Sequence, residues 1–539
     1  MSGGFRSRSK GAQDQTRGSG QTSSRNNAGR SSADSQQGKT RYGNSNRGPA
    51  HRENQHRGGQ PERTRQRGKS QHPQRDNRAR NKHNSHDSIV SHIRGDVDLP
   101  RKVALEVLFR VNEEQAYANL LLPKALRQYK VKGRDAAFAT EITYGTLRTQ
   151  GIVDAIIDDC STRLLATLHP VVRNALRLGV YQLLYTRVED HAAVHTSVEM
   201  VDPKARGFVN AILRKVSRSS REQWLSKLAP SQPLERLAWQ NAHPRWIAES
   251  FARILPAEEL EDALAADSAR PLVHLAARPQ ELGADELSLI TGGEEAKYSP
   301  YGVYLPAGDP GDLEVIRQGL AIVQDEGSQL IARAVTKIPL AGTSNTPERW
   351  LDLCAGPGGK ATMLGALAQG VANVDAVEVV AHRANLVEQA TRGLPVHVHN
   401  VDGRNSGLEP GYDRILIDAP CSGLGALRRR PEARWRKEEA DIVALQQLQF
   451  ELLHAAYGLL RPGGSLVYST CSPDLRETRD VVTRAIKELG AVEGNAHDLA
   501  PELPADAQSE VTGPAIQLWP HRHGTDAMFF AWLQKPLES

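Results

Sequence analysis

Two cysteines occupy positions from which a thiol could act as a nucleophile beside an acid. Cys421 lies in the segment 418–423, three residues after Asp418, and Cys471 lies in the segment 469–472. Both segments follow apolar runs that we expect to be strands, so both thiols should face the crevice outside the carboxyl ends of a sheet. A single cysteine is more often a buried apolar residue. Two at neighbouring strand ends, one of them close to an acid, predict covalent thiol chemistry.

A glycine loop precedes these segments and follows an apolar run at 350–353. The loop residues that we expect to bind a cofactor are Cys354, Ala355, Gly356, Pro357, Gly358, Gly359 and Lys360. Glycines let a ligand approach the backbone, and the start of a helix exposes free N–H groups. The loop is not a P-loop, because Cys354 stands where that motif needs glycine and Ala361 replaces its Ser or Thr. Ala361 also breaks the dinucleotide motif, which leaves a nucleoside-binding loop.

Two acids follow at intervals that suit an adenosine. Glu378 ends the next apolar run, 22 residues beyond Gly356, where an acid commonly binds the ribose hydroxyls. Asp402 ends the third run and is placed to reach an adenine amino group. Each acid alone could be an ordinary polar strand end. Together after a glycine loop they predict an adenosine-bearing cofactor such as S-adenosylmethionine.

A thiol beside a methyl donor could serve as the nucleophile in the methylation of cytosine at C5. That carbon is a poor nucleophile, but a thiolate that adds to C6 makes C5 enamine-like and able to take a methyl group. An acid that holds a proton near N3 or N4 stabilises the developing charge, and Asp418 is placed for this task.

These residues need a sheet to bring them together. Apolar runs that we expect to be strands lie at 350–353, 374–379, 396–401, 414–418, 465–468 and 528–533. Helical stretches separate several of them, and this alternation predicts a parallel, doubly wound, Rossmann-like α/β core. We expect this core to be a methyltransferase domain over residues 338–537.

Two further units are expected before the core. Apolar residues at helical spacing predict an all-helical domain over residues 97–222. Residues 233–337 open with a helix and continue in short apolar pieces that Gly and Pro interrupt, which predicts a linker helix and a small α+β subdomain.

The motifs resemble those of the Sun/Nop-type RNA (5-methylcytosine) methyltransferase family. The resemblance is carried by residues 418–423, Gly425, Arg429, Arg430, Pro431, Trp435 and 470–472. Residues 194–199 and 205–215 resemble the NusB-type RNA-binding fold, which narrows the likeness to the RsmB (Fmu) branch of the family. The resemblance covers residues 99–537. The family loop more often has Ala and Thr where this chain has Gly356 and Ala361.

The resemblance implies a role for each matching residue. Cys471 would be the nucleophile that bonds to C6, and Cys421 would assist product release. Residues 354–360, Glu378, Asp402 and Asp418 would line the S-adenosylmethionine pocket. Asp418 would also activate the base, with help from Lys360. The implied reaction is methylation of a cytosine of the small-subunit (16S) ribosomal RNA, with the helical and middle domains docking the RNA.

An arginine-rich stretch follows Cys421. We predict that Arg429 and Arg430 contact RNA phosphates and that Trp435 stacks on a base. The alternative is a solvated loop with a packed tryptophan. His521 and His523 have no Cys or acidic partner at metal-binding spacing, so we predict no metal site.

The composition argues against a membrane protein and against a secreted protein. The chain has 539 residues, four scattered cysteines and a mean hydropathy of −0.49. We find no apolar run long enough to span a membrane and no secretory leader, so we expect a cytoplasmic protein that neither spans nor binds a membrane. We also expect it to be a monomer. Residues 1–90 carry 19 Lys and Arg against 6 Asp and Glu, although the whole chain is only +5. The basic tail, 1–96, is predicted to be disordered, either binding RNA or merely solvating the chain.

Three other functions stay open. A transfer RNA cytosine-C5 methyltransferase would share the catalytic motifs. A non-catalytic NusB-like RNA-binding factor has no need of both thiols, Asp418 and the glycine loop. A small-molecule methyltransferase has no need of an RNA-binding domain.

Overall fold

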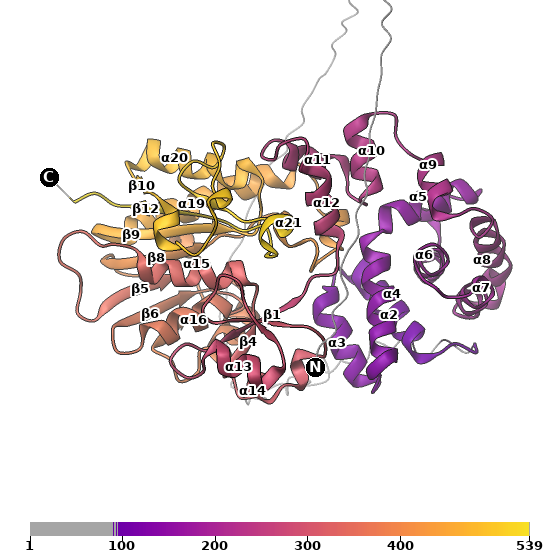
Figure 1. The fold of residues 1–539 in the computed structure, drawn as a ribbon, viewed down its shortest axis with the longest axis horizontal. Coiled ribbons are helices and arrows are strands. Elements are labelled where there is room, and N and C mark those ends of the chain that lie inside the picture. The colour runs from indigo at the N-terminus through magenta and orange to yellow at the C-terminus, as the bar shows by residue number, and fades with distance from the viewer. Residues whose placement is uncertain (1–89, 91–92, 94, 538–539) are drawn as a thin grey trace, which may run out of the picture. The chain divides into compact units, whose positions relative to one another are not determined.

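A helical bundle forms the first part of the described chain. The computed structural model describes residues 90, 93 and 95–537, so the tail predicted over 1–96 lies almost entirely outside them. The bundle consists of α2 (Leu99–Glu114), α3 (Ala118–Gln128), α4 (Gly133–Arg148), α5 (Gln150–Cys160), α6 (Pro170–Tyr185), α7 (Asp190–Glu199), α8 (Pro203–Val216) and α9 (Arg221–Lys227) (Figure 1). Asp98 begins α2, because its side chain accepts the N–H of Arg101.

The bundle encloses a core of its own. Leu105, Leu108, Ile142 and Leu176 are fully buried in it. A Cβ at Gly145 of α4 would lie 1.9 Å from the ring of Tyr181 in α6, so only glycine allows this close helix packing. The expectation of an all-helical domain is confirmed.

A helical linker and a small sheet follow. The linker helices are α10 (Pro233–Gln240), α11 (Arg245–Ala252) and α12 (Leu260–Ser268). The sheet has the order β2-β3-β1-β4 with antiparallel pairs, and its strands are β1 (Val273–Ala277), β2 (Glu294–Glu295), β3 (Gly302–Leu305) and β4 (Ala321–Val323). Helices α13 (Ala284–Thr291) and α14 (Glu314–Arg317) belong to the same α+β unit, and α15 (Glu326–Lys337) leads into the large sheet.

The large sheet has eight strands in the order β10-β12-β9-β8-β5-β6-β7, with β11 paired to β12. The strands are β5 (Glu348–Asp352), β6 (Ala372–Val377), β7 (Val396–His399), β8 (Tyr412–Asp418), β9 (Leu460–Thr470), β10 (Val492–Gly494), β11 (Ile516–Gln517) and β12 (Phe529–Gln534). Strands β5 to β9 are parallel, as expected, but β12 runs antiparallel to β9. The sheet is therefore mixed, a parallel core with antiparallel strands at one edge.

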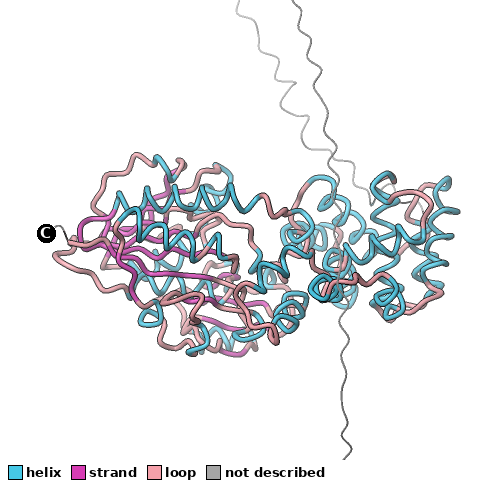
Figure 2. The backbone as a smooth tube through the Cα atoms, turned by 90° about the horizontal axis from the view of Figure 1, so that it is seen from above, coloured by secondary structure: helices cyan, strands magenta, loops and turns pink. Residues whose placement is uncertain are grey.

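Helices cover both faces of this sheet (Figure 2). Trp350, Leu416 and Val467 pack with α15 and α16 (Gly359–Ala368), whereas the alternate residues Leu351 and Ile415 pack with α19 (Asp441–Leu459) and α20 (Arg479–Leu489). The remaining helices are α17 (Ala381–Ala390), α18 (Ala433–Arg436) and α21 (Pro520–His523). Within the described residues, no helix has the length and apolar character needed to cross a membrane.

Candidate active site

The candidate site lies where the strand order reverses. The chain runs from β5 outward to β7, and then returns to β8 on the other side of β5. Asp352 ends β5 and Asp418 ends β8, its direct parallel neighbour. Such a switch point at the carboxyl ends of parallel strands is the usual ligand crevice of an open α/β sheet.

The glycine loop joins β5 to α16 at this edge. Gly358 has φ +114°, a backbone conformation that favours glycine, and α16 starts at the next residue. A Cβ at Gly356 would lie 2.1 Å from a carboxylate oxygen of Glu378, so the loop approaches that acid closely. The N–H of Ala355 donates to the carbonyl of Val377, which ties the loop to the end of β6.

The structure brings Glu378 to the loop, whereas Asp402 lies in a more open setting. Glu378 is buried; it accepts the N–H of Val380 and pairs with Arg383, which also donates to the carbonyl of Gly356. Sequence reasoning missed Arg383, which no motif marks. Asp402 follows β7 and pairs with Arg404 at 2.7 Å; the hydrogen bond from Arg404 lowers the pKa of Asp402.

Lys360 and Asp418 form an ion pair at the switch point. The Lys360 Nζ lies 2.7 Å from a carboxylate oxygen of Asp418, and Ser469 donates to the other oxygen at 3.2 Å. Burial alone would lower the pKa of Lys360, but the Asp418 carboxylate outweighs it and the pKa is raised. The lysine therefore stays charged at neutral pH and holds the Asp418 carboxylate in place.

The two predicted cysteines meet beside this ion pair. Their Sγ atoms lie 3.4 Å apart, and both residues are partly exposed free thiols. The hydrogen bond from Cys421 lowers the pKa of Cys471, against the effects of burial and of Asp418, while Arg430 and Lys360 lower it further. The same hydrogen bond, together with burial, raises the pKa of Cys421 well above its usual value. Cys471 is therefore the thiol that ionises first.

Glu477 holds the two cysteine loops together, and no sequence signal pointed to it. Its buried carboxylate accepts the N–H of Ser422 at 2.7 Å and the hydroxyl of Ser472 at 2.6 Å. Gln449 of α19 donates both to Glu477 and to the carbonyl of Pro420. The residue after each cysteine is thus fixed by one carboxylate.

Asp352 is a second acid without an assigned role. It is fully buried, and neither of its carboxylate oxygens has a hydrogen-bond partner among the described residues. Burial, reinforced by the charge of Asp418, raises its pKa to about 7. A charged residue inside the apolar run 350–353 was a signal that could have identified it.

Two residues predicted to contact RNA make contacts within the chain. Arg429 pairs with Asp325 at 2.8 Å and with Asp526 at 2.9 Å. The Trp435 indole N–H donates to the carbonyl of Leu147 in α4. Arg430 is exposed, and no hydrogen bond or ion pair engages its side chain within the described chain. RNA contact by Arg429, Arg430 and Trp435 stays a prediction.

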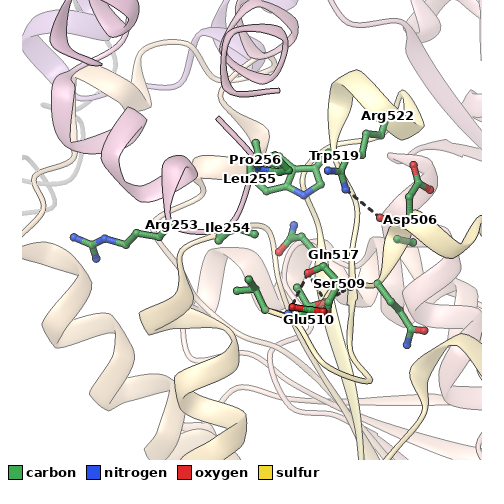
Figure 3. Close-up of a pocket in the computed structure, with 14 residues that line it drawn as sticks. Arg253, Ile254, Leu255, Pro256, Asp506, Ser509, Glu510, Gln517, Trp519 and Arg522 are labelled. Atoms are coloured by element: carbon green, nitrogen blue, oxygen red, sulfur yellow. Dashed lines mark hydrogen bonds between the residues drawn. The ribbon is translucent and has the colours of Figure 1, made fainter. Parts of the chain in front are cut away.

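A separate cavity of about 360 Å³ lies between the end of α11 and the loop 506–512 (Figure 3). Ile254, Leu255, Trp519 and Arg522 are among its lining residues, and Arg522 donates to the carbonyl of Asp506. None of the predicted site residues lines it. The part of the chain that the structure describes contains no group of His, Cys, Asp and Glu side chains that could hold a metal ion.

Two parts of the chain match known protein families. Residues 340–534 match the family described as 16S rRNA methyltransferase RsmB/F, and residues 98–218 match the NusB family. The putative methyltransferase Rv1407 of Mycobacterium tuberculosis is 52% identical over 449 residues, which cover 81% of this chain and 97% of that protein.

More distant relatives match over the same length. The probable ribosomal RNA small subunit methyltransferase B of Bacillus subtilis is 30% identical over 455 residues, covering 81% of this chain and 98% of the relative. The crystal structure of PH0851 superposes with a TM-score of 0.70 at 23% identity, covering 82% of this chain and 100% of that chain. This last likeness shows the fold.

Proposed function

This chain belongs to the 16S rRNA methyltransferase RsmB/F family and is an S-adenosylmethionine-dependent RNA methyltransferase; from this premise we propose that it methylates C5 of a cytosine in small-subunit ribosomal RNA. The observation that carries the proposal is the pair of thiols of Cys421 and Cys471, 3.4 Å apart beside the Lys360–Asp418 ion pair. A methyltransferase acting on a nitrogen or a hydroxyl needs no such pair.

Cys471 acts as the nucleophile in this proposal. Its thiolate adds to C6 of the cytosine, which forms the S–C6 bond and moves the electron pair to C5. After C5 has taken the methyl group, its proton passes to a base, either water or the Cys421 thiolate. The electron pair of that C–H bond forms the C5=C6 double bond and the S–C6 bond breaks, which returns Cys471 as a thiolate. The lowered pKa of Cys471, due first to the hydrogen bond from Cys421, supports this assignment. Cys421 assists the release step.

Asp418 and Lys360 activate the base. The Asp418 carboxylate accepts a hydrogen bond from the amino group at N4 of the cytosine, and the charge of Lys360 beside it stabilises the negative charge that develops on the ring as the thiolate adds. Lys360, 2.7 Å away, fixes the orientation of that carboxylate.

The strand ends fit S-adenosylmethionine, which when bound supplies a methyl group on a positively charged sulfur. Glu378 would hold the ribose hydroxyls and Asp402 the adenine amino group, while residues 354–360 would contact the cofactor through their backbone. The buried Asp352 carboxyl, whose pKa is about 7, adds negative charge at the same edge when it ionises, which suits a cation.

Small-subunit ribosomal RNA is the proposed substrate because it is the substrate named for the relatives that match most of this chain. The helical domain (97–222) and the α+β subdomain (233–337) would dock the RNA, and residues 338–537 would transfer the methyl group. We expect a monomer that acts in the cytoplasm, where this RNA is found.

The test is methyl transfer from labelled S-adenosylmethionine to unmodified 16S ribosomal RNA, with transfer RNA in parallel. Wild type should label a cytosine at C5, Cys471→Ala should be inactive, and Cys421→Ala should accumulate a covalent RNA adduct. Labelling of transfer RNA alone would show that the substrate is transfer RNA and not 16S ribosomal RNA. Labelling that survives Cys471→Ala would show that Cys471 is not the nucleophile. Tight RNA binding without labelling would favour a binding factor.

A further inference from the structure

The segment after Cys421 connects the catalytic strands to the helical bundle. Its start is fixed at the thiols, because the N–H of Gly425 donates to the carbonyl of Cys471 at 2.9 Å. Its middle is fixed by Arg428 and Arg429, which both pair with Asp526. Its end is fixed by Trp435, whose indole donates to Leu147. The segment therefore holds part of the bundle at a defined place relative to the two cysteines.

The segment also fixes the backbone of the bundle around Tyr117. The N–H of Ala118 donates to the buried carboxylate of Glu432 at 3.2 Å. On the other side of Tyr117, Arg436 donates to the carbonyls of Ala116, at 2.7 Å, and of Val111. The backbone is thus fixed on both sides of Tyr117, yet 51% of this residue is exposed. An anchored, exposed aromatic ring is a surface ready for stacking.

Arg430 lies over this ring, with its guanidinium carbon 5.8 Å from the ring centroid, and Arg436 lies over it at 6.0 Å. The other arginines of the segment, Arg428, Arg429, Arg434 and Arg436, all donate hydrogen bonds within the chain, whereas Arg430 has neither a hydrogen bond nor an ion pair in the described structure. Its charge is nevertheless near enough to Cys471 to favour the thiolate. Arg430 is therefore an exposed cation that lies over Tyr117 and near Cys471.

We propose that Tyr117 and Arg430 form a clamp for a nucleotide that flanks the target cytosine, in which the tyrosine ring stacks on its base and the guanidinium binds its phosphate. The inference rests on the proposed function and adds a substrate-positioning site contributed by the helical bundle. Single-stranded RNA is held in this way in general, by aromatic rings that stack on unpaired bases and by cations that follow the backbone. The ring position fixed by Glu432 and Arg436 would set how far the flanking base lies from Cys471.

The test measures the affinity of the full-length protein for 16S ribosomal RNA transcribed in vitro. All variants carry Cys471→Ala, so that a covalent bond does not contribute to retention. The variants are Tyr117→Ala, Tyr117→Phe and Arg430→Gln. The matched control is Arg163→Gln, since Arg163 also lies over an aromatic ring of the bundle, Phe208, at 5.6 Å.

Tyr117→Ala should weaken RNA binding about tenfold, and Tyr117→Phe should restore it to within about twofold, because stacking needs the ring and not the hydroxyl. Arg430→Gln should reduce the slope of log Kd against log salt concentration by about 0.7, the loss of one phosphate contact. The affinity for S-adenosylmethionine and the melting temperature should not change in any variant.

The clamp is overturned if Tyr117→Ala binds as tightly as the Arg163→Gln control, if Tyr117→Phe is as weak as Tyr117→Ala, or if RNA is not bound at all. The proposed function fails separately: wild type that binds the RNA without methylating it would end the catalytic proposal, and the binding comparison would still decide the clamp.

Discussion

The Sγ atoms of Cys421 and Cys471 lie 3.4 Å apart, although the two residues are 50 positions apart in the chain. The contact is asymmetric, because it lowers the pKa of Cys471 and raises that of Cys421. The pair therefore contains one thiol that ionises more readily and one that keeps its proton, which suits a reaction that must both form and break a bond to sulfur.

Cys421→Ala should raise the pKa of Cys471, because it removes the hydrogen bond that most lowers it. Alkylation of Cys471 by iodoacetamide, followed by mass spectrometry of its peptide, should become slower at neutral pH, and its pH profile should move upward. Cys160→Ala, in the helical bundle, is the control and should change nothing. An unchanged profile in Cys421→Ala would show that the thiols do not interact.

Glu477→Ala should lower kcat more than tenfold while leaving the KM for S-adenosylmethionine unchanged. The substitution leaves the N–H of Ser422 and the hydroxyl of Ser472 without their acceptor, so both cysteine loops lose their fixed position. Buried donors without a partner should also reduce the free energy of unfolding by about 3 kcal/mol.

Glu451→Ala is the matched control for Glu477→Ala, since Glu451 is an exposed acid on α19 that pairs with Arg404. It should leave the free energy of unfolding almost unchanged, because an ion pair in contact with solvent contributes little to stability. Equal losses of kcat in the two variants would contradict the role of Glu477 in positioning the thiols.

Asp352 should make the cofactor-free protein less stable as the pH rises toward neutrality. Its pKa is about 7 in the folded chain because of burial, against about 3.9 in an unfolded chain. Between these values the unfolded chain has released the proton and the folded chain still holds it, so the free energy of unfolding falls as the pH rises. The loss should level off above about pH 7 and amount to at most about 4 kcal/mol.

Asp352→Asn should remove this component of the pH dependence, as measured by urea unfolding at several pH values. The wild-type affinity for the cationic cofactor should also rise with pH through about 7, as the carboxylate ionises, and this rise should be absent in Asp352→Asn. Identical pH dependence in the two proteins would show that Asp352 does not titrate in this range.

The sequence placed the two thiols and Asp418 at neighbouring strand ends because backbone topology alone brings them together. The part of Lys360 beside Asp418 was implied only by the family resemblance. Parallel strands place their carboxyl ends at one edge of the sheet, so residues that end β8 and β9 must lie near each other whatever the side chains do. The α/β class followed from the same alternation of apolar runs. The antiparallel β12 was not predicted, because an apolar run does not encode the direction of its strand.

Side chains whose partners lie far along the chain could not be found in this way. Trp435 donates to a carbonyl 288 positions away, and Arg429 pairs with an acid 97 positions away. An arginine-rich loop with a tryptophan has the same composition whether it meets RNA or its own chain. Glu477 lies in a loop with no periodic pattern, and Tyr117 reaches the catalytic loop only through the fold.

Gly151 should prove essential for the contact between the bundle and the catalytic loop. A Cβ at Gly151 of α5 would lie 2.4 Å from the Trp435 indole, so Gly151→Ala should displace that ring and break its hydrogen bond to Leu147. The expected loss in the free energy of unfolding is about 2 kcal/mol. In a Trp435→Leu background the smaller side chain leaves room for the methyl group, and the same substitution should cost less than about 0.5 kcal/mol.

Gly207→Ala in α8, where an added Cβ meets no atom within 4 Å, is the control and should stabilise the protein by about 0.5 to 1 kcal/mol. Equal costs of Gly151→Ala in both backgrounds would mean that Trp435 does not pack against α5, and the anchoring of the segment after Cys421 would then depend on its arginines alone.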